Sequence, residues 1–414
     1  MNDRRVVARR IPSMTDTTPV PATRVPPSIF VLAAVSGLAP LSLNIVVPSI
    51  PGLADAFHTD YATAQLVVTA FILSMAIGQL LIGTLSDALG RRPVLLAGIG
   101  IYIASSAVCA LAPTIEVLVA ARVVEAIGGV SGVVLARAII RDVYSRDQSA
   151  SALGYVTMVM VVAPMMAPAA GGLLDDHIGW RATFWLMTGI GVSLFVLAFA
   201  KLGETNVSER RKPRFGTLLG GFATLLGRRS FLAFTGTMAF ASATFFTFLG
   251  AAPHVAIELI GNTPTEYGLA FMSISIAFMS GNFTAARLAP RLGTMPLILC
   301  GSLLCLAGVF VMAGVVFLTG VTTATLFGSM MIVTYANGVL VPPVIASVVS
   351  VRPDLAGAAS GLAGSIQFAT AALATYVVAL RADGTAEPMV WQIGLFAALS
   401  LASALWARRV TARS

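Results

Sequence analysis

Twelve apolar runs, each about long enough to cross a bilayer, follow one another along this chain of 414 residues. A helix needs about 20 apolar residues to span the hydrocarbon core of a membrane. The composition agrees, because 57% of the residues are hydrophobic and 11% are charged, whereas soluble chains carry about 25% charged residues. The sequence therefore predicts an all-α integral membrane protein. The predicted runs lie at 28–50, 64–85, 93–112, 115–138, 150–173, 182–201, 231–252, 266–287, 295–317, 322–347, 354–380 and 388–407.

The distribution of Lys and Arg predicts the orientation of the chain. If the N-terminus and every even-numbered loop are cytoplasmic, 23 of the 26 Lys and Arg residues lie on the cytoplasmic side and only Arg181 and Arg381 lie outside. An excess of Lys and Arg in the cytoplasmic loops sets membrane topology. We therefore expect a multi-pass protein of the cell (inner) membrane with both termini in the cytoplasm. Basic residues scattered over loops argue against nucleic acid as a partner, and the polar first 27 residues predict no cleavable signal peptide.

The longest internal hydrophilic stretch, Lys201 to Arg229, divides the runs into six and six. Transporters built from two repeats hold their substrate between the halves near the midplane of the membrane. We therefore favour twelve transmembrane helices in two six-helix halves over the alternative of an ordinary long loop. The predicted parts are an N-terminal tail (1–27), a first half (28–201), a linker (202–230), a second half (231–408) and a C-terminal tail (409–414).

The loop after the second run reads GTLSDALGRR, residues 83–92. Gly83 and Gly90 allow a tight connection between two helices, and Arg91 and Arg92 anchor it at the membrane boundary. A loop that only sets topology would need only the arginines. Asp87 is the unusual residue, because a carboxylate at this depth is stabilised by a partner or by a helix N-terminus.

The fifth run reads LGYVTMVMVVAPMMAPAAGG, residues 153–172. Small residues let helices approach closely in lipid, and prolines are tolerated in spanning helices when neighbours satisfy the freed carbonyls. We favour a kinked gate helix that seals against a partner and rocks, and the alternative is a plain packing face. The residues of this pattern are Gly154, Ala163, Pro164, Ala167, Pro168, Gly171 and Gly172.

The two segments resemble motifs of the major facilitator superfamily. With five further stretches, the chain looks like the bicyclomycin/chloramphenicol-resistance (Bcr/CflA) branch of its drug:proton antiporters over about residues 28 to 408. These stretches are AIGG (126–129), ARAIIRDVY (136–144), GWRATFW (179–185) and the segments 250–271 and 355–368. The fifth run is similar to the antiporter pattern Gly-x8-Gly-x3-Gly-Pro-x2-Gly-Gly, with alanine at two of its glycines. The resemblance implies the major facilitator fold. It also implies an inner gate in which Asp87 caps a helix of the other half and Arg91 pairs with Asp142.

Two charges lie inside the fourth run. Arg122 is the only basic residue in the interior of a run, and Glu125 follows on the same helical face. Charges at this depth are costly and mark functional sites by default. We expect this pair to face a central cavity and to carry proton coupling, and the alternative is a structural ion pair.

The first run departs from the pattern of the resembling branch. That branch has an aspartate where this chain has Asn44, and an amide cannot carry a proton at physiological pH. We infer that Glu125 has taken over as the proton site. The alternative is that proton coupling is lost.

Apolar, adaptable side chains supply the remaining candidates for the cavity. Met and Phe form pockets that accept varied ligands, although such residues also face lipid or the protein core. The cavity candidates are Met158, Met165, Phe245, Phe246 and Gln367.

The predicted function is proton-coupled efflux of drugs or other small amphipathic compounds by alternating access, and hence antibiotic resistance. Its partners are a small-molecule substrate, protons and the lipid bilayer, and a monomer is the expectation from the resemblance. Export or import of a metabolite such as a sugar by the same fold is the alternative. A membrane enzyme is disfavoured because the runs carry no nucleophile–base set, and direct use of ATP is disfavoured because no phosphate-binding loop is present. We expect no cofactor and no metal site, and the identity and charge of the substrate stay open.

Overall fold

The computed structural model describes residues 28–144, 146–205 and 215–412. The predicted N-terminal tail and the centre of the predicted linker lie outside the described residues. The helical elements are α1 (Ile29–Ser36), α2 (Leu38–Ile45), η1 (Val47–Ser49), α3 (Ile50–Ala56), α4 (Tyr61–Leu89), α5 (Arg91–Leu111), α6 (Ile115–Val143), α7 (Arg146–His177), α8 (Arg181–Lys201), α9 (Phe215–Leu226), α10 (Arg229–Pro253), η2 (His254–Leu259), α11 (Pro264–Leu292), α12 (Thr294–Thr319), α13 (Thr323–Ser350), η3 (Pro353–Leu355), α14 (Ala356–Leu380) and α15 (Glu387–Thr411).

Twelve helical segments of the described chain are long and apolar enough to cross a membrane. They coincide with the twelve predicted runs, so the predicted all-α membrane architecture is confirmed. Most segments extend past the predicted ends, as in Ile115–Val143 against 115–138. The reason is that the polar terminal turns of a helix lie outside its apolar stretch. The first span, Ile29–Ala56, is composed of α1, α2, η1 and α3 in succession.

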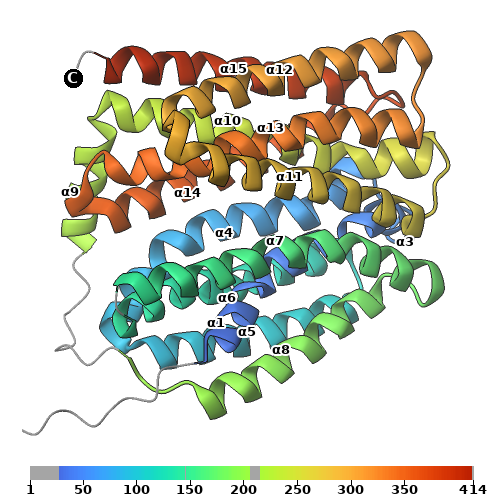
Figure 1. The fold of residues 1–414 in the computed structure, drawn as a ribbon. Helices are drawn as coiled ribbons and strands as arrows, with labels where there is room; N and C mark the ends of the chain where they lie inside the picture. Colours follow the sequence, from blue (N-terminus) through green and yellow to red (C-terminus); the bar gives the residue numbers. More distant parts are fainter. Residues whose placement is uncertain (1–27, 145, 206–214, 413–414) are drawn as a thin grey trace, which may run out of the picture.

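Two groups of helices lie side by side along the molecule (Figure 1). Elements α1 to α8 pack mainly on one another, and α10 to α15 do the same. Helix α9 lies between the two groups in sequence and packs on α10 and α14. We call the end of the bundle that carries α9 and the Gly90 turn the linker end, and the other the opposite end.

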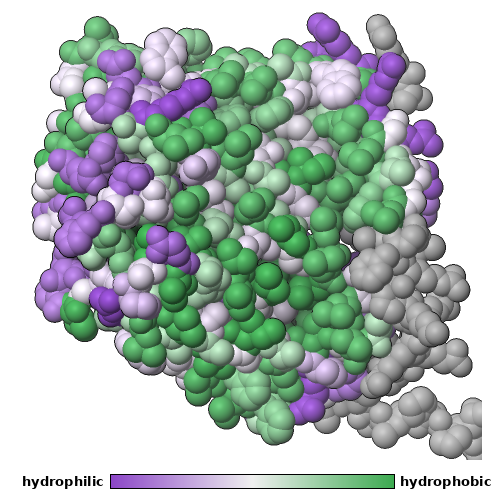
Figure 2. Space-filling view, turned by 180° about the vertical axis from the view of Figure 1, so that it is seen from behind, coloured by the Kyte–Doolittle hydropathy of each residue, from purple (hydrophilic) through white to green (hydrophobic). Residues whose placement is uncertain are grey.

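The middle of the molecular surface is apolar. Figure 2 shows hydrophobic residues over most of one face, with hydrophilic residues gathered toward the ends. Large side chains from the middle of the spans, such as Phe310, Leu373 and Leu303, are 70%, 59% and 55% exposed. A contiguous apolar surface of this kind marks a region that something other than water covers, and a bilayer is the covering that twelve apolar spans require.

The two groups meet along α4 with α14 and along α7 with α11. Near the opposite end, the Tyr61 hydroxyl donates to the Gly250 carbonyl at 2.9 Å. About two turns further along α4, the Thr69 hydroxyl lies 3.2 Å from the Thr375 hydroxyl of α14. Thr265 at the start of α11 also donates to the Asp176 carboxylate at the end of α7. Hydrogen bonds therefore join the two groups of helices near the opposite end.

Candidate functional site

Arg122 lies on α6 with its guanidinium completely buried. Its Nη1 is 2.8 Å from Glu125 Oε2 and donates to the Ser42 hydroxyl at 2.8 Å. Its Nη2 donates to the Ser42 carbonyl and its Nε to the Val67 carbonyl, both at 3.2 Å. The guanidinium carbon lies 3.9 Å from the centre of the Phe71 ring. The arginine is therefore held by four hydrogen bonds and a cation–π contact, which is the kind of satisfaction that a buried charge requires.

Glu125 completes a triad with Arg122 and Ser42. Its Oε1 accepts a hydrogen bond from the Ser42 hydroxyl at 2.9 Å, and the Cys109 sulfur lies 3.7 Å from Oε2. Ser42 thus accepts from the arginine and donates to the carboxylate. This one side chain of the first span therefore contacts both charges.

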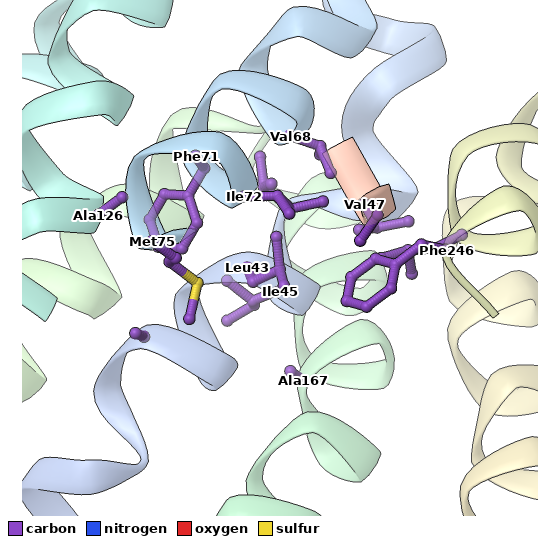
Figure 3. Close-up of a cluster of buried hydrophobic side chains, with 14 of the residues drawn as sticks. Leu43, Ile45, Val47, Val68, Phe71, Ile72, Met75, Ala126, Ala167 and Phe246 are labelled. Carbon is purple, nitrogen blue, oxygen red and sulfur yellow. The ribbon is translucent and has the colours of Figure 1, made fainter. Parts of the chain in front are cut away.

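The triad is enclosed by the first group of helices. Ser42 comes from α2, Val67 and Phe71 from α4, and Cys109 from α5, while the Phe184 ring of α8 lies 5.8 Å from the guanidinium. Figure 3 shows Phe71 of α4 among the buried apolar side chains of this group. Neither Arg122 nor Glu125 has any exposed surface. The expectation that the pair faces a central cavity therefore differs from the structure.

The physical reason lies in the glycines that share the helical face of the pair. A Cβ on Gly132 would lie 2.3 Å from the Val35 carbonyl oxygen, and one on Gly129 would lie 3.2 Å from the Ala39 Cβ. The glycines bring this face of α6 against α1 and α2. The charged pair on the same face is buried with it.

Asn44 is not joined to the triad by a hydrogen bond. Its Nδ2 donates to the Pro40 carbonyl at 2.9 Å, and its Oδ1 is buried with no hydrogen-bond partner among the described residues. Two residues along a helix is a turn of about 200°, so Asn44 points away from the side on which Ser42 meets the charges. The structure therefore brings together two of the three predicted coupling residues and adds Ser42, which the sequence analysis missed.

The turn at Gly90 holds the predicted loop residues together. Gly90 has φ of 103°, a conformation that glycine adopts without strain. Arg91 lies 2.6 Å from Asp87 and 2.9 Å from Asp142, so the expected pairing of Arg91 with Asp142 is present in the geometry. Asp87 is 62% exposed, and its predicted role as the cap of a helix in the other half stays a prediction.

Glu204, which the sequence analysis did not single out, caps the start of α5. Its carboxylate accepts from the backbone N–H groups of Arg91 at 3.0 Å and Arg92 at 3.3 Å. The Arg92 side chain donates to the carbonyls of Leu202 at 2.7 Å and Phe199 at 3.0 Å. The Gly90 turn is thereby tied to the end of α8. A carboxylate at a helix N-terminus is favourable. Glu204 lies more than 100 residues from Arg91 and Arg92 in sequence, so no local sequence pattern predicted this cap.

The small residues of α7 contact two different helices. A Cβ on Gly171 would lie 1.8 Å from the Ile45 carbonyl oxygen of α2. A Cβ on Gly172 would lie 2.1 Å from the Pro264 carbonyl oxygen of α11, and one on Gly268 would lie 2.3 Å from the Pro168 carbonyl oxygen. Any larger residue at these positions would separate the helices.

The rest of the predicted motif is consistent with this packing where it is described. Pro164 and Pro168 lie inside α7, and Ala167 is fully buried. For Gly154 and Ala163 only the helical backbone belongs to the described part of the structure. Gly83 lies on α4, where an added Cβ would approach Val134 to 4.0 Å.

The predicted cavity residues fall in different surroundings. Phe246 is 8% exposed, comes from α10 and points toward Val47 of η1 in the first group (Figure 3). Phe245 packs edge-on against Phe246, with the ring centres 5.4 Å apart. Gln367 donates to the Ser242 hydroxyl at 2.5 Å. Met165 is half-buried and Met158 is 56% exposed.

Comparison with known proteins places these features in a family context. Residues 32–375 match the family model described as Major Facilitator Superfamily. The chain is 30% identical over 363 residues to the MFS-type transporter YdgK of Bacillus subtilis (strain 168), covering 87% of this chain and 90% of that protein. It is 27% identical over 388 residues to a bicyclomycin resistance protein homolog of Haemophilus influenzae, covering 90% and 94%. A chloramphenicol resistance protein of Pseudomonas aeruginosa is 30% identical over 288 residues, covering 69% and 68%.

Solved transporter structures share the fold. The xylose transporter XylE from E. coli, in a partially occluded inward open conformation, superposes with a TM-score of 0.72 at 14% identity, covering 92% of this chain and 97% of that one. A bacterial homolog of the human lysosomal transporter Spinster, in an inward-facing and occupied conformation, superposes with a TM-score of 0.70 at 16% identity, covering 93% and 96%. At these identities the likeness establishes the fold alone.

Proposed function

Because the chain belongs to the Major Facilitator Superfamily, a family of transporters and not of enzymes, we propose that it exports drugs or other small amphipathic compounds in exchange for protons. In this proposal the two six-helix halves, 28–201 and 231–408, move as bodies around a substrate held between them. The working unit is a monomer in the cell membrane. Relatives named for resistance to bicyclomycin and chloramphenicol support the export of antibiotics.

The proposed orientation puts the linker end in the cytoplasm. It rests on the strong excess of Lys and Arg that the loops would then place inside. The opposite end becomes the outer end. The contacts of Tyr61 with Gly250 and of Asp176 with Thr265 then belong to an outer closure.

The main support for proton coupling is the position of Glu125. It is a fully buried carboxylate in the interior of the membrane-spanning region, where an ionisable residue marks a functional site by default. Proton exchange requires Glu125 to reach water, and its contact with Ser42 must loosen for that to happen.

The first span provides a mechanical connection between Ser42 and the second half. Segment η1 follows α2 directly and contacts α10 and α11 of the second half. A movement of that half therefore acts on the span that carries Ser42. In the proposed cycle this movement changes the hydrogen bonds of Glu125 and makes its protonation depend on the position of the halves.

The residues between the halves support neutral or amphipathic substrates. The polar side chains that we assign to this region are Asn44 of α2, Gln367 of α14 and Ser242 of α10, and none of them carries a charge. The charge of Arg122 is balanced by Glu125 within the first half. A cationic drug would meet no carboxylate among these residues.

Substrate-triggered proton movement in everted membrane vesicles tests the proposed function. The vesicles are energised to acidify their lumen and are then challenged with neutral and cationic antibiotics. We expect neutral drugs to discharge the gradient with the unchanged protein and with Glu116→Gln, a matched control because Glu116 is an exposed carboxylate on the same helix. Glu125→Gln should abolish the discharge.

Two results would contradict the proposal at different points. Full proton movement with Glu125→Gln would show that Glu125 is not the proton site. No proton movement with any drug would remove the support for coupled drug export. Transport of a metabolite such as a sugar by the same fold would then be the leading alternative.

A further inference from the structure

The small-residue face of α7 continues past Gly172 to a carboxylate. Pro168, Gly172 and Asp176 are spaced by four residues and lie on one face of the helix. The backbones of Pro168 and Gly172 approach Gly268 and Pro264 of α11 so closely that a Cβ would clash. Asp176 therefore comes next to the start of α11, on the other half of the molecule.

Asp176 binds the first turn of α11 through two hydrogen bonds. Its Oδ2 accepts the backbone N–H of Thr265 at 2.9 Å and also the Thr265 hydroxyl. Pro264 has no N–H to satisfy. The Glu266 N–H donates to the Thr263 hydroxyl at 3.1 Å, and the Glu266 carboxylate accepts from the Thr263 N–H at 2.9 Å. The helix thus caps its own start except at Thr265, whose N–H is satisfied by the other half.

We propose that Asp176 is a positioning residue for transport, because its carboxylate caps α11 across the two halves and stabilises the state in which the outer end is closed. The bond exists only while α7 and α11 remain crossed at this end. A negative charge at a helix N-terminus is favourable, and that gain is lost to water when the halves separate. This inference rests on the proposed function for the movement of the halves.

Asp175 provides a matched control for Asp176. It is the adjacent carboxylate, and a Cβ on Gly52 would lie 3.9 Å from its Oδ2. Asp175 therefore faces α3 of its own half, whereas Asp176 reaches α11 of the other half. Removing either charge changes the net charge of α7 by the same amount, so a difference between the two variants reports the contact with α11.

The test measures the separation of the halves at the outer end by pulsed electron paramagnetic resonance. Spin labels are attached at Ile178→Cys and Leu318→Cys, in the first and second halves, where the native side chains are 73% and 86% exposed. The exposed Cys300 is replaced by serine, while the other two cysteines are buried. The protein is measured in lipid nanodiscs without substrate and without a proton gradient.

We expect Asp176→Asn to raise the ratio of outer-open to outer-closed molecules about two- to fivefold, the range for one surface charge at a helix N-terminus. Asp175→Asn should leave the ratio unchanged. Thr265→Val, which keeps the N–H and removes the hydroxyl, should shift the ratio in the same direction by a smaller factor. It also covers the case in which Asp176→Asn does not fold.

Equal distance distributions for Asp176→Asn and Asp175→Asn would overturn the inference. If only Thr265→Val can be measured, a distribution identical to that of the parent protein would overturn it as well. These outcomes are separate from those of the proposed function, because the distance measurement requires no substrate. A failed drug assay with a positive distance result would leave the cap in place and redirect the search for the substrate.

Discussion

Removing one partner of the Arg122–Glu125 pair should be much more damaging than removing both. Each side chain is completely buried, and their charged atoms lie 2.8 Å apart. Loss of one partner leaves the other as an uncompensated buried charge, which costs about 3–5 kcal/mol. Replacement of both by apolar residues of similar size is often neutral or stabilising. We therefore expect Arg122→Met and Glu125→Met each to lower the free energy of unfolding by about 3–5 kcal/mol.

The double variant should recover most of that loss, so that the interaction energy between the two positions is about as large as either single effect. Unfolding by denaturing detergent, followed by tryptophan fluorescence, measures all four proteins. The exposed pair Arg352 and Asp354, with side chains 32% and 59% exposed, is the control. Its single variants should show unchanged stability, since solvent screens exposed ion pairs.

Additive effects at Arg122 and Glu125 would refute this reasoning. The double variant would then be as unstable as the two single losses combined, and the hydrogen bonds to Ser42 and Val67 would outweigh the ion pair. The measurement also bears on function. A double variant that folds well but moves no protons would separate the stability of the pair from its proposed role in coupling.

Two further substitutions test the packing on either side of the site. Gly172→Ala places a Cβ 2.1 Å from the Pro264 carbonyl oxygen, so it should raise the outer-open fraction in the spin-label measurement. Gly189→Ala is the control, because open space surrounds Gly189, and it should leave that fraction unchanged. Equal outer-open fractions for the two variants would contradict the close contact. Glu204→Gln weakens the cap of α5 and should lower the free energy of unfolding by about 1 kcal/mol, and an unchanged unfolding midpoint would show that the cap contributes nothing.

The spans were predictable because the bilayer imposes a length on every helix that crosses it. The pairing of Arg91 with Asp142 followed from the resemblance of the Gly90 loop to a known gate. Ser42 and Glu204 could not be found in this way. A serine in an apolar run carries no sign of a contact 83 residues away, and such contacts are decided by tertiary packing.

The sequence also could not predict which helices the charged face of α6 contacts. Helical periodicity places Arg122 and Glu125 on the same face. It does not say which neighbours that face meets. The glycines at 129 and 132 determine these neighbours, because they let α1 and α2 pack more closely against α6 than larger residues would allow. The same pattern would have fitted a cavity-facing helix equally well.

The buried polar groups of the first half include a charged pair, Arg122 and Glu125, and this limits where the proposed proton coupling can reside. In the described part of the second half, the interior of the spans holds amides, hydroxyls and the thiols of Cys300 and Cys305. Asn337 donates to Thr244 at 2.9 Å, and Gln392 donates to Thr247 at 3.0 Å. Neither an amide nor a hydroxyl titrates at physiological pH.

The charged residues of the second half's spans lie within about two turns of a span end, and Arg287 of α11 is among those farthest from one. A proton that is exchanged deep in the membrane must therefore use the first half, where Glu125 is the fully buried carboxylate. The second half would then act on that proton only through contacts, such as those of η1 with α10 and α11. Substitutions in η1, which change no charged residue, should therefore alter drug-triggered proton movement in the vesicle assay.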